Sequence, residues 1–424
     1  MLDELAARGL FQECTDRNGL GELLAKSAPV AVYAGFDPTS PSLHVGNLVP
    51  TILLKRFQLG GHRPVVVVGG ATGMIGDPSG KSSERNLLDE ATLAANVRGI
   101  HAQLSRLLDY NTSPTGAVMT NNYDWTKNLT YLDFLRDYGK FLTVNYMTAK
   151  DSVESRLSGE TGISYTEFSY MLLQAYDFVK LAESHGCRLQ VGGSDQYGNI
   201  TAGCELQRKM GRPQLFGWVA PLLLDSSGQK MGKTSTGERV WLDAERTTPF
   251  AFYQYFLNRT DEEVPRLLKM FSTEPLARIE EVLREHDADR AKRIAQKELA
   301  RAMTTWVHGA GSIAAIEASA GEMFGGDLSK LSDAQLADMA GTVPTTDLPR
   351  SELEAGISLV DLVVRVGLEP SKGKARTTIE QGGLSVNDVV VKDVAKKITI
   401  ADLMTETRLV LRKGKKNLRI VHAV

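Results

Sequence analysis

The feature that most constrains the fold is a run of four consecutive valines, residues 65–68, followed by paired glycines at 69–70. An uninterrupted apolar run of this length predicts a strand buried on both faces. Residues 30–36 form a second apolar run, and residues 45–59 between the two carry apolar side chains at helical spacing. A strand, a helix and a strand within about 40 residues predict a βαβ unit, and therefore a doubly wound parallel sheet.

Beyond this unit, the expected secondary structure changes twice along the chain. Residues 188–191 predict a further strand that also runs into paired glycines, which extends the Rossmann-like sheet. After residue 245 the sequence is rich in Ala, Leu, Glu and Arg at helical spacing, and the last 74 residues hold a helix pair and several short strands. We therefore expect four parts, namely a catalytic α/β domain with an inserted helical segment at 1–225, a loop and an α-helical domain at 226–340, a linker at 341–350, and a small α+β module at 351–424.

Composition excludes several classes of protein. No apolar run is long enough to span a membrane, and no basic segment followed by an apolar stretch opens the chain as in a signal peptide. The three cysteines and seven histidines lack the spacing of disulfide frameworks or metal sites, so we expect no metal site and a cytoplasmic location. The net charge is −2, yet residues 351–424 hold 13 Lys/Arg against 9 Asp/Glu. Such a basic tail fits either a polyanion-binding module or a solvated surface.

Two separate segments carry a possible nucleotide site. Residues 39–47, T-S-P-S-L-H-V-G-N, place His44 and Asn47 on one side of a helix start, where backbone N–H groups attract anions. Gly46 between them lets a ring or ribose approach the backbone closely. Residues 230–234, K-M-G-K-T, follow an expected strand at 221–224 and bring two lysines that can stabilise phosphate charge. Each segment alone also fits an ordinary helix start or a basic surface loop.

Together these segments resemble the H-I-G-H and K-M-S-K-S motifs of class I aminoacyl-tRNA synthetases, with Asn47 and Gly232 as departures. The resemblance implies that an amino-acid carboxylate attacks the α-phosphorus of ATP, that Mg²⁺ arrives with the ATP, and that no cofactor is tightly bound. It implies the catalytic residues Thr39, His44, Asn47, Lys230, Lys233 and Thr234, with Lys81 and Arg85 as further candidates that also fit a solvated pair of charges. It implies the ATP-binding residues Gly35, Asp37, His44, Gly46, Asn47, Gly192, Asp195, Lys230 and Lys233.

The amino-acid specificity is suggested by residues 164–177, which predict a helix that opens with the capping box Ser164–Glu167. Tyr170, Gln174 and Asp177 fall on one face of this helix, which fits either a binding site or a polar solvent face. This helix, with residues 33–39, 69–81, 121–125 and 192–199, resembles bacterial tyrosyl-tRNA synthetases. The resemblance implies the tyrosine-binding residues Tyr33, Asp77, Asn122, Tyr170, Gln174, Asp177 and Gln196. Tyr33 and Asp177 would bind the phenolic hydroxyl, and Tyr170, Gln174 and Asp77 the ammonium group. Ala34 stands where many relatives have a cysteine.

The C-terminal stretch 356–391 resembles a small RNA-binding module first known from a small-subunit ribosomal protein. The resemblance implies L-tyrosine, ATP and tRNA(Tyr) as substrates and a homodimer, with Tyr165 and Phe168 at its interface. The expected RNA contacts are Lys372, Lys374, Arg376, Arg412, Lys413, Lys415 and Lys416.

The sequence alone leaves three other classes of protein open. Tryptophanyl-tRNA synthetases share the fold and both nucleotide motifs. Small nucleotidyltransferases share an H-x-G-H-like motif but lack an RNA module. A synthetase-derived RNA-binding protein without activity would be expected to lose His44 or the lysine loop, and both are present.

Overall fold

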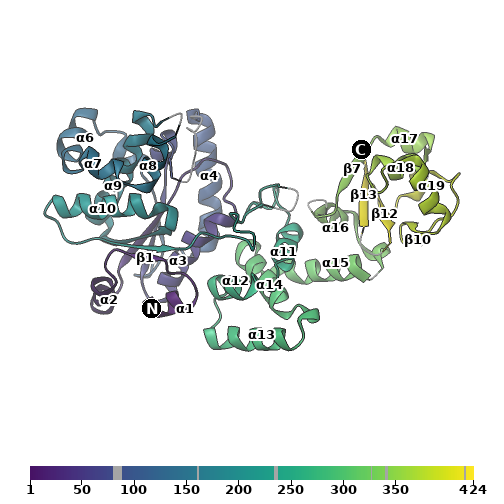
Figure 1. Cartoon of the computed structure of the whole chain (residues 1–424), viewed down its shortest axis with the longest axis horizontal. Helices are drawn as coiled ribbons and strands as arrows, with labels where there is room; N and C mark the ends of the chain where they lie inside the picture. Colours follow the sequence, from purple (N-terminus) through teal and green to yellow (C-terminus); the bar gives the residue numbers. More distant parts are fainter. Residues whose placement is uncertain (80–87, 160–161, 234–236, 326, 340–341, 415–416) are drawn as a thin grey trace. The chain divides into compact units, whose positions relative to one another are not determined.

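The computed structural model describes residues 1–79, 88–159, 162–233, 237–325, 327–339, 342–414 and 417–424 (Figure 1). These residues form two compact units, one of residues 1–243 with 259–299, the other of residues 244–258 with 300–424. The helical stretch after residue 245 therefore contributes to both units.

A six-stranded sheet forms the centre of the first unit. Its strands, in spatial order, are β1 (Glu13–Cys14), β6 (Phe216–Ala220), β5 (Cys187–Gly193), β2 (Ala31–Phe36), β3 (Arg63–Val68) and β4 (Val118–Asn121). All neighbouring pairs are parallel except β1 with β6. From β2 the chain runs outward through β3 to β4 and then returns to β5 on the other side. The predicted doubly wound sheet is confirmed, and its order reverses between β2 and β5, where such sheets bind ligands beyond the strand ends.

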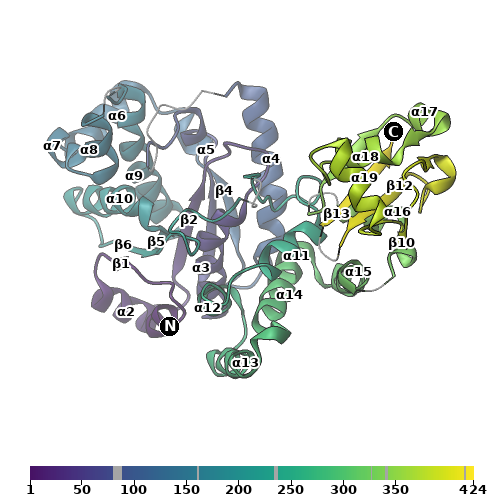
Figure 2. The ribbon, with the colours of Figure 1, turned by 45° about the vertical axis from the view of Figure 1, so that its right-hand side comes forward.

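Helices cover the sheet of this unit (Figure 2). The helices of this unit are α1 (Leu2–Ala7), α2 (Arg17–Lys26), α3 (Leu48–Leu59), α4 (Glu90–Leu107), α5 (Tyr123–Thr126), α6 (Tyr131–Asp137), α7 (Val144–Thr148), α8 (Asp151–Leu157), α9 (Tyr165–His185), α10 (Tyr197–Lys209), α12 (Val264–Phe271) and α13 (Leu276–Ala288), and not all of them touch the sheet. Helix α3 packs on β2, β3 and β5. Phe178 and Leu181 of α9 pack with Tyr33 and Val65. The valine run is buried throughout, as a strand covered on both faces requires.

Helix α9 begins at Ser164, whose hydroxyl accepts a hydrogen bond from the Glu167 backbone N–H at 3.2 Å. Glu167 does not provide the reciprocal half of the predicted capping box. Its carboxylate instead accepts two hydrogen bonds from the Arg156 guanidinium, at 2.7 and 2.8 Å, because both side chains are buried and a buried charge requires a partner. The helix ends at Gly186, which takes the left-handed conformation with φ of 64°.

The expected strand at 221–224 is wrong. The strand is β6, which ends at Ala220, and only Leu224 of the expected segment pairs, in an isolated bridge with Lys230. Three leucines in a row suggested a strand, but Leu222 and Leu223 instead contact the cavity of the site.

The second unit contains a five-stranded sheet in the order β10 (Val389–Val390), β9 (Leu384–Val386), β12 (Arg408–Lys413), β13 (Asn417–Ala423) and β7 (Thr345–Leu348). Strands β8 (Ile357–Ser358) and β11 (Lys397–Ile398) pair separately. Its helices are α11 (Pro249–Leu257), α15 (Ile313–Gly325), α16 (Asp333–Asp338), α17 (Arg350–Ala355), α18 (Leu359–Arg365) and α19 (Lys372–Glu380), and α14 (Ile294–His308) begins in the first unit and ends in the second.

Part of the stretch expected to be a linker, Thr345–Leu348, forms strand β7 and pairs in parallel with β13. The Pro and Thr composition of this stretch is typical of a linker, but β13 offers a sheet edge that satisfies its backbone groups. The hairpin β9–β10 turns at Asn387 and Asp388, both at positive φ, which asparagine and aspartate tolerate better than other side chains.

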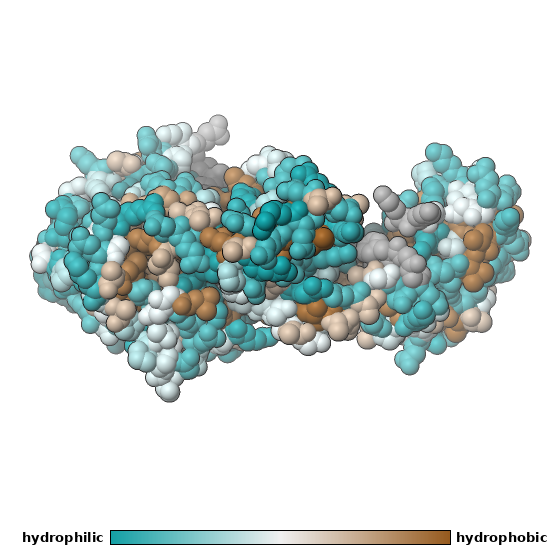
Figure 3. Space-filling view, turned by 90° about the horizontal axis from the view of Figure 1, so that it is seen from below, coloured by the Kyte–Doolittle hydropathy of each residue, from teal (hydrophilic) through white to brown (hydrophobic). Residues whose placement is uncertain are grey.

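The face of the molecule shown in Figure 3 is largely hydrophilic, with hydrophobic residues in small groups. Among the described residues, no helix is both long and apolar enough to cross a membrane.

Candidate active site

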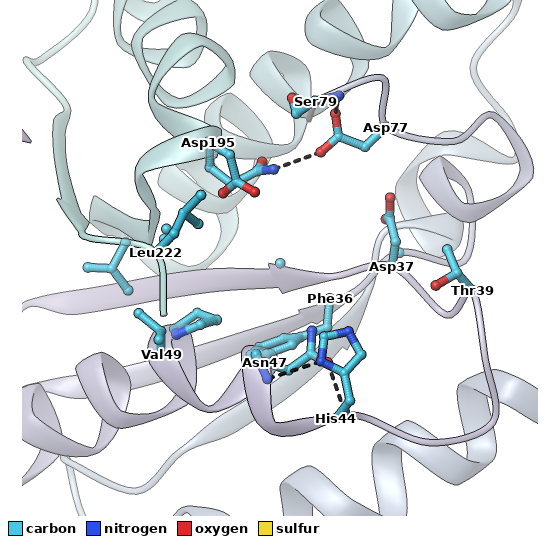
Figure 4. Close-up of a pocket in the computed structure, with 18 of the residues that line it drawn as sticks. Phe36, Asp37, Thr39, His44, Asn47, Val49, Asp77, Ser79, Asp195 and Leu222 are labelled. Atoms are coloured by element: carbon cyan, nitrogen blue, oxygen red, sulfur yellow. Dashed lines mark hydrogen bonds between the residues drawn. The ribbon is translucent and has the colours of Figure 1, made fainter. Parts of the chain in front are cut away.

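A cavity of about 640 Å³ opens beyond the carboxyl ends of β2 and β5, at the point where the sheet order reverses (Figure 4). Every described residue predicted for the tyrosine or ATP site contacts this cavity. These residues are Tyr33, Gly35, Asp37, Thr39, His44, Gly46, Asn47, Asp77, Asn122, Tyr170, Gln174, Asp177, Gly192, Asp195, Gln196, Lys230 and Lys233. Lys81, Arg85 and Thr234 lie outside the described residues.

His44 and Asn47 form a closed turn at the start of the helix that leads into α3. The His44 Nδ1 accepts from the Gly46 backbone N–H at 3.0 Å, and the Asn47 Oδ1 accepts from the His44 backbone N–H at 3.0 Å. A neutral imidazole that accepts at Nδ1 carries its proton on Nε2, so His44 acts as a donor there. The Asn47 amide provides the reciprocal cap, which explains how an asparagine can occupy this position.

The loop with Lys230 and Lys233 is anchored by backbone pairing. The Met231 N–H donates to the Leu223 carbonyl at 2.7 Å, and Lys233 pairs with Arg239 in an isolated bridge. Gly232 between the lysines has φ of 119°, a conformation that other residues rarely adopt. Glycine in place of the motif's serine therefore matches the backbone of this loop.

The Lys230 ammonium lies 3.6 Å from the Asp195 carboxylate. Burial raises the pKa of Asp195, and the lysine charge counteracts this shift. A carboxylate and a flexible lysine are thus held together at the edge of the cavity, where both can exchange protein partners for ligand groups.

One end of the cavity carries a buried carboxylate, Asp177. Its two oxygens accept hydrogen bonds from Asn122 Nδ2 at 2.9 Å and from the Trp125 indole Nε1 at 2.7 Å. Burial raises its pKa to about 7, while these two donors act in the opposite direction. The Tyr33 hydroxyl is buried and has no hydrogen-bond partner among the described residues. Burial, followed by the Asp177 charge, raises the pKa of this phenol well above its usual value.

A second polar group lies further along α9. The Tyr170 hydroxyl donates to the Asp37 Oδ2 at 2.8 Å, and burial is the main cause of its raised pKa. Gln174 Nε2 contacts Gln196 Oε1 at 3.4 Å, and Gln196 Nε2 donates to the Asp77 carboxylate at 2.7 Å. These side chains bring oxygen acceptors to the same cavity, as the binding of a cationic group requires.

Two residues with structural importance were missed from the sequence. Trp125 and Thr72 both lie in segments that resemble the family, but neither was assigned a role. The Trp125 indole donates to Asp177, whereas Thr72 lines the cavity itself and hydrogen-bonds to Asp37 and Asn122. Nothing in the local pattern distinguishes such residues, because their partners are between 35 and 52 positions away along the chain.

The predicted RNA-contact residues have different surroundings. Lys372, Lys374 and Arg376 are exposed on α19, and Lys372 pairs with Asp361 at 2.6 Å. Arg412 lies 3.0 Å from Asp388, and Lys413 lies 2.8 Å from the buried Glu369, so both charges are partly neutralised. Lys415 and Lys416 lie outside the described residues.

Comparisons with known proteins define the class first. The family "tRNA synthetases class I (W and Y)" matches residues 25–325, and the "Tyrosine--tRNA ligase SYY-like C-terminal domain" matches residues 335–421. The fold is therefore that of a class I aminoacyl-tRNA synthetase.

Individual relatives show which family within this class the chain belongs to. A tyrosine–tRNA ligase of Rhodopirellula baltica is 49% identical over 98% of this chain and 94% of its own length. One of Roseiflexus castenholzii is 48% identical over 100% of this chain and 99% of its own. The crystal structure of a C-terminally truncated mitochondrial tyrosyl-tRNA synthetase of Aspergillus nidulans matches with a TM-score of 0.70 and 30% identity, over 76% of this chain and 94% of that one. The chain belongs to the tyrosine–tRNA ligase family.

Proposed function

We propose that the chain activates L-tyrosine with ATP to form tyrosyl-adenylate and pyrophosphate, and then transfers the tyrosine to tRNA(Tyr). The observation that carries the choice of amino acid is the pair formed by Tyr33 and Asp177. A phenolic hydroxyl can donate to the Asp177 carboxylate and accept from the Tyr33 hydroxyl, which otherwise has no partner among the described residues.

The pair formed by Tyr33 and Asp177 also argues against phenylalanine and tryptophan as substrates. Phenylalanine would leave both buried groups without a partner, which is costly. The tryptophan indole has a donor but no acceptor, so the Tyr33 hydroxyl would stay unpaired. Titration calorimetry with L-tyrosine, L-phenylalanine and L-tryptophan tests this choice. Tight binding of tyrosine alone is expected, and tighter binding of tryptophan would overturn it.

The remaining roles follow the chemistry of the cavity. Asp77, Gln174 and Tyr170 would accept hydrogen bonds from the substrate ammonium group, with Asn122 and Gln196 holding them in place. Gly35, Asp37, Gly46, Gly192 and Asp195 would bind the nucleotide. Thr39, His44, Asn47, Lys230 and Lys233, with Lys81, Arg85 and Thr234, would stabilise the charge that develops on the phosphates.

In this mechanism the protein forms no covalent bond to the substrate. The residues hold the tyrosine carboxylate against the α-phosphorus of ATP, and the donors around the phosphates stabilise the departing pyrophosphate. Among the described residues, no group of three or more His, Cys, Asp or Glu could hold a metal ion. Mg²⁺ would arrive bound to the phosphates of ATP.

The C-terminal sheet and helices would bind the tRNA through Lys372, Lys374 and Arg376, with Arg412, Lys413, Lys415 and Lys416 as a second group. We propose that this module starts no later than β7, with the catalytic domain before residue 225 and the helical part between. The three free cysteines are compatible with a reducing cytoplasm, the location we propose.

Tyrosine affinity is expected to fall as the pH is lowered from about 8 to about 6. Asp177, with its pKa of about 7, takes up a proton in this range and loses the charged acceptor for the phenol. Fluorescence titration of tyrosine across this range measures the effect. The variant Asp177→Asn should bind more weakly with no such pH dependence, and an unchanged dependence in that variant would contradict the assignment.

We also propose a homodimer formed through the exposed apolar residues of α6 to α9. Tyr131, Leu132, Val144 and Tyr165 are all exposed there, and the hydroxyls of Tyr131 and Tyr165 lie 3.1 Å apart. An exposed apolar cluster of this kind is typical of an interaction site. Phe168, also expected at the interface, is half-buried among the neighbouring core residues.

Leu132→Asp is expected to shift the protein from dimer to monomer in sedimentation velocity, since a charge at the centre of an apolar interface is costly. Leu59→Asp, at an exposed leucine elsewhere on the unit, is the matched control and should stay dimeric. Dissociation of the control to the same extent would contradict the location of the interface.

A further inference from the structure

A continuous chain of hydrogen bonds joins two of the carboxylates that line the cavity, Asp37 and Asp177. The Thr72 hydroxyl donates to Asp37 Oδ1 at 2.7 Å. Asn122 Nδ2 donates both to Thr72 Oγ1 at 3.0 Å and to Asp177 Oδ2 at 2.9 Å. Thr72 and Asn122 are 4% and 1% exposed, so these bonds exchange little with water.

The direction of every bond in this chain follows from the groups themselves. The Asn122 Oδ1 accepts from the Ala71 backbone N–H at 2.7 Å, which fixes the orientation of the amide. Its two N–H protons therefore point to Thr72 and Asp177. Because Thr72 accepts one of them, its single hydroxyl proton goes to Asp37. The Asn122 amide therefore donates on one side to Asp177 and on the other to Thr72, which in turn donates to Asp37.

The backbone before Thr72 is shaped to permit this chain. A Cβ atom on Gly69 would lie 2.2 Å from Asp37 Oδ1 and 2.4 Å from Thr72 Oγ1. Any side chain at this position would separate the two groups. Gly69, directly after the valine strand, therefore leaves space for the contact between the Asp37 and Thr72 side chains.

Each end of the chain reaches a residue of the proposed tyrosine site. Asp37 accepts from the Tyr170 hydroxyl at 2.8 Å, and Asp177 faces the phenol end. We propose that Thr72 is a positioning residue that orients Asn122 and Asp177 on one side and Asp37 and Tyr170 on the other. The Thr72 hydroxyl would then fix the orientation of the side chains that bind both ends of the tyrosine substrate. This inference rests on the proposed activation of tyrosine.

The variant Thr72→Val tests the proposal, because it keeps the shape and removes the hydroxyl. Asn122 then has one N–H without an acceptor, and Asp37 loses a donor. We expect tyrosine to bind about 10-fold more weakly and the preference for tyrosine over phenylalanine in pyrophosphate exchange to fall by about 10-fold or more. Thr72→Ser retains the hydroxyl and should restore both values to near the wild-type level.

Thr120→Val is the matched control, since it removes a threonine hydroxyl bond elsewhere in the same unit, from Thr120 of β4 to the Val66 carbonyl at 3.1 Å. It should leave the preference unchanged. The proposal is overturned if Thr72→Val keeps affinity and preference within about twofold of an active wild type, or if Thr72→Ser loses as much as Thr72→Val. A wild type without tyrosine-dependent exchange would instead overturn the proposed function, and this inference with it.

Discussion

Lys233→Ala is expected to slow the formation of tyrosyl-adenylate by about 100- to 1,000-fold, with tyrosine affinity almost unchanged. Lys233 contacts the cavity from the loop that holds Gly232, whereas Tyr33 and Asp177 contact it from β2 and α9. Its ammonium group would stabilise charge that grows on the phosphates only as the bond to pyrophosphate breaks. A group that acts in this way changes the rate and leaves the binding of the amino acid intact.

Single-turnover measurements of adenylate formation, combined with equilibrium titration of tyrosine, separate the two effects. Lys209→Ala, at the end of α10 and outside the residues that contact the cavity, is the matched control and should behave as the wild type. A loss of tyrosine affinity as large as the loss of rate in Lys233→Ala would refute the division of roles.

Asp177→Ala is expected to produce the opposite pattern. Tyrosine should bind about 10- to 100-fold more weakly, because the phenol loses a charged acceptor and Asn122 and Trp125 are left with unpaired buried N–H groups. Phenylalanine, which has no hydroxyl to donate, should be affected much less. The preference for tyrosine over phenylalanine therefore falls by a similar factor.

The same titrations with both amino acids measure this change. Asp177→Asn, which keeps the shape and one acceptor, should give an intermediate preference. If both variants lost affinity for tyrosine and phenylalanine equally, Asp177 would be a structural residue and the phenol would be recognised elsewhere.

Much of the catalytic fold could be predicted because its signals are local. Four valines in succession, the helical spacing of residues 45–59 and the glycines at 69–70 specify a βαβ unit without reference to the rest of the chain. Many of the predicted ligand groups lie near the carboxyl ends of strands or on one face of α9. Parallel strands end at one edge of the sheet, so residues such as Gly35 and Gly192 meet in the same cavity.

What the sequence did not predict depends on partners that are distant along the chain. Glu167 pairs with Arg156 in place of completing the capping box, and Thr345–Leu348 form a strand because β13 offers an edge. The role of Thr72 is visible only when Asp37 and Asn122 are seen beside it. The roles assigned to individual site residues stay predictions, although the cavity brings the described ones together.

The most direct test of the central claim is the exchange of labelled pyrophosphate into ATP, measured without tRNA for each of the standard amino acids in turn. Exchange that depends on L-tyrosine alone is expected. Exchange that depends on tryptophan would contradict the assignment of Tyr33 and Asp177. Absence of exchange with every amino acid, from folded protein that still binds RNA, would contradict the proposed catalytic function.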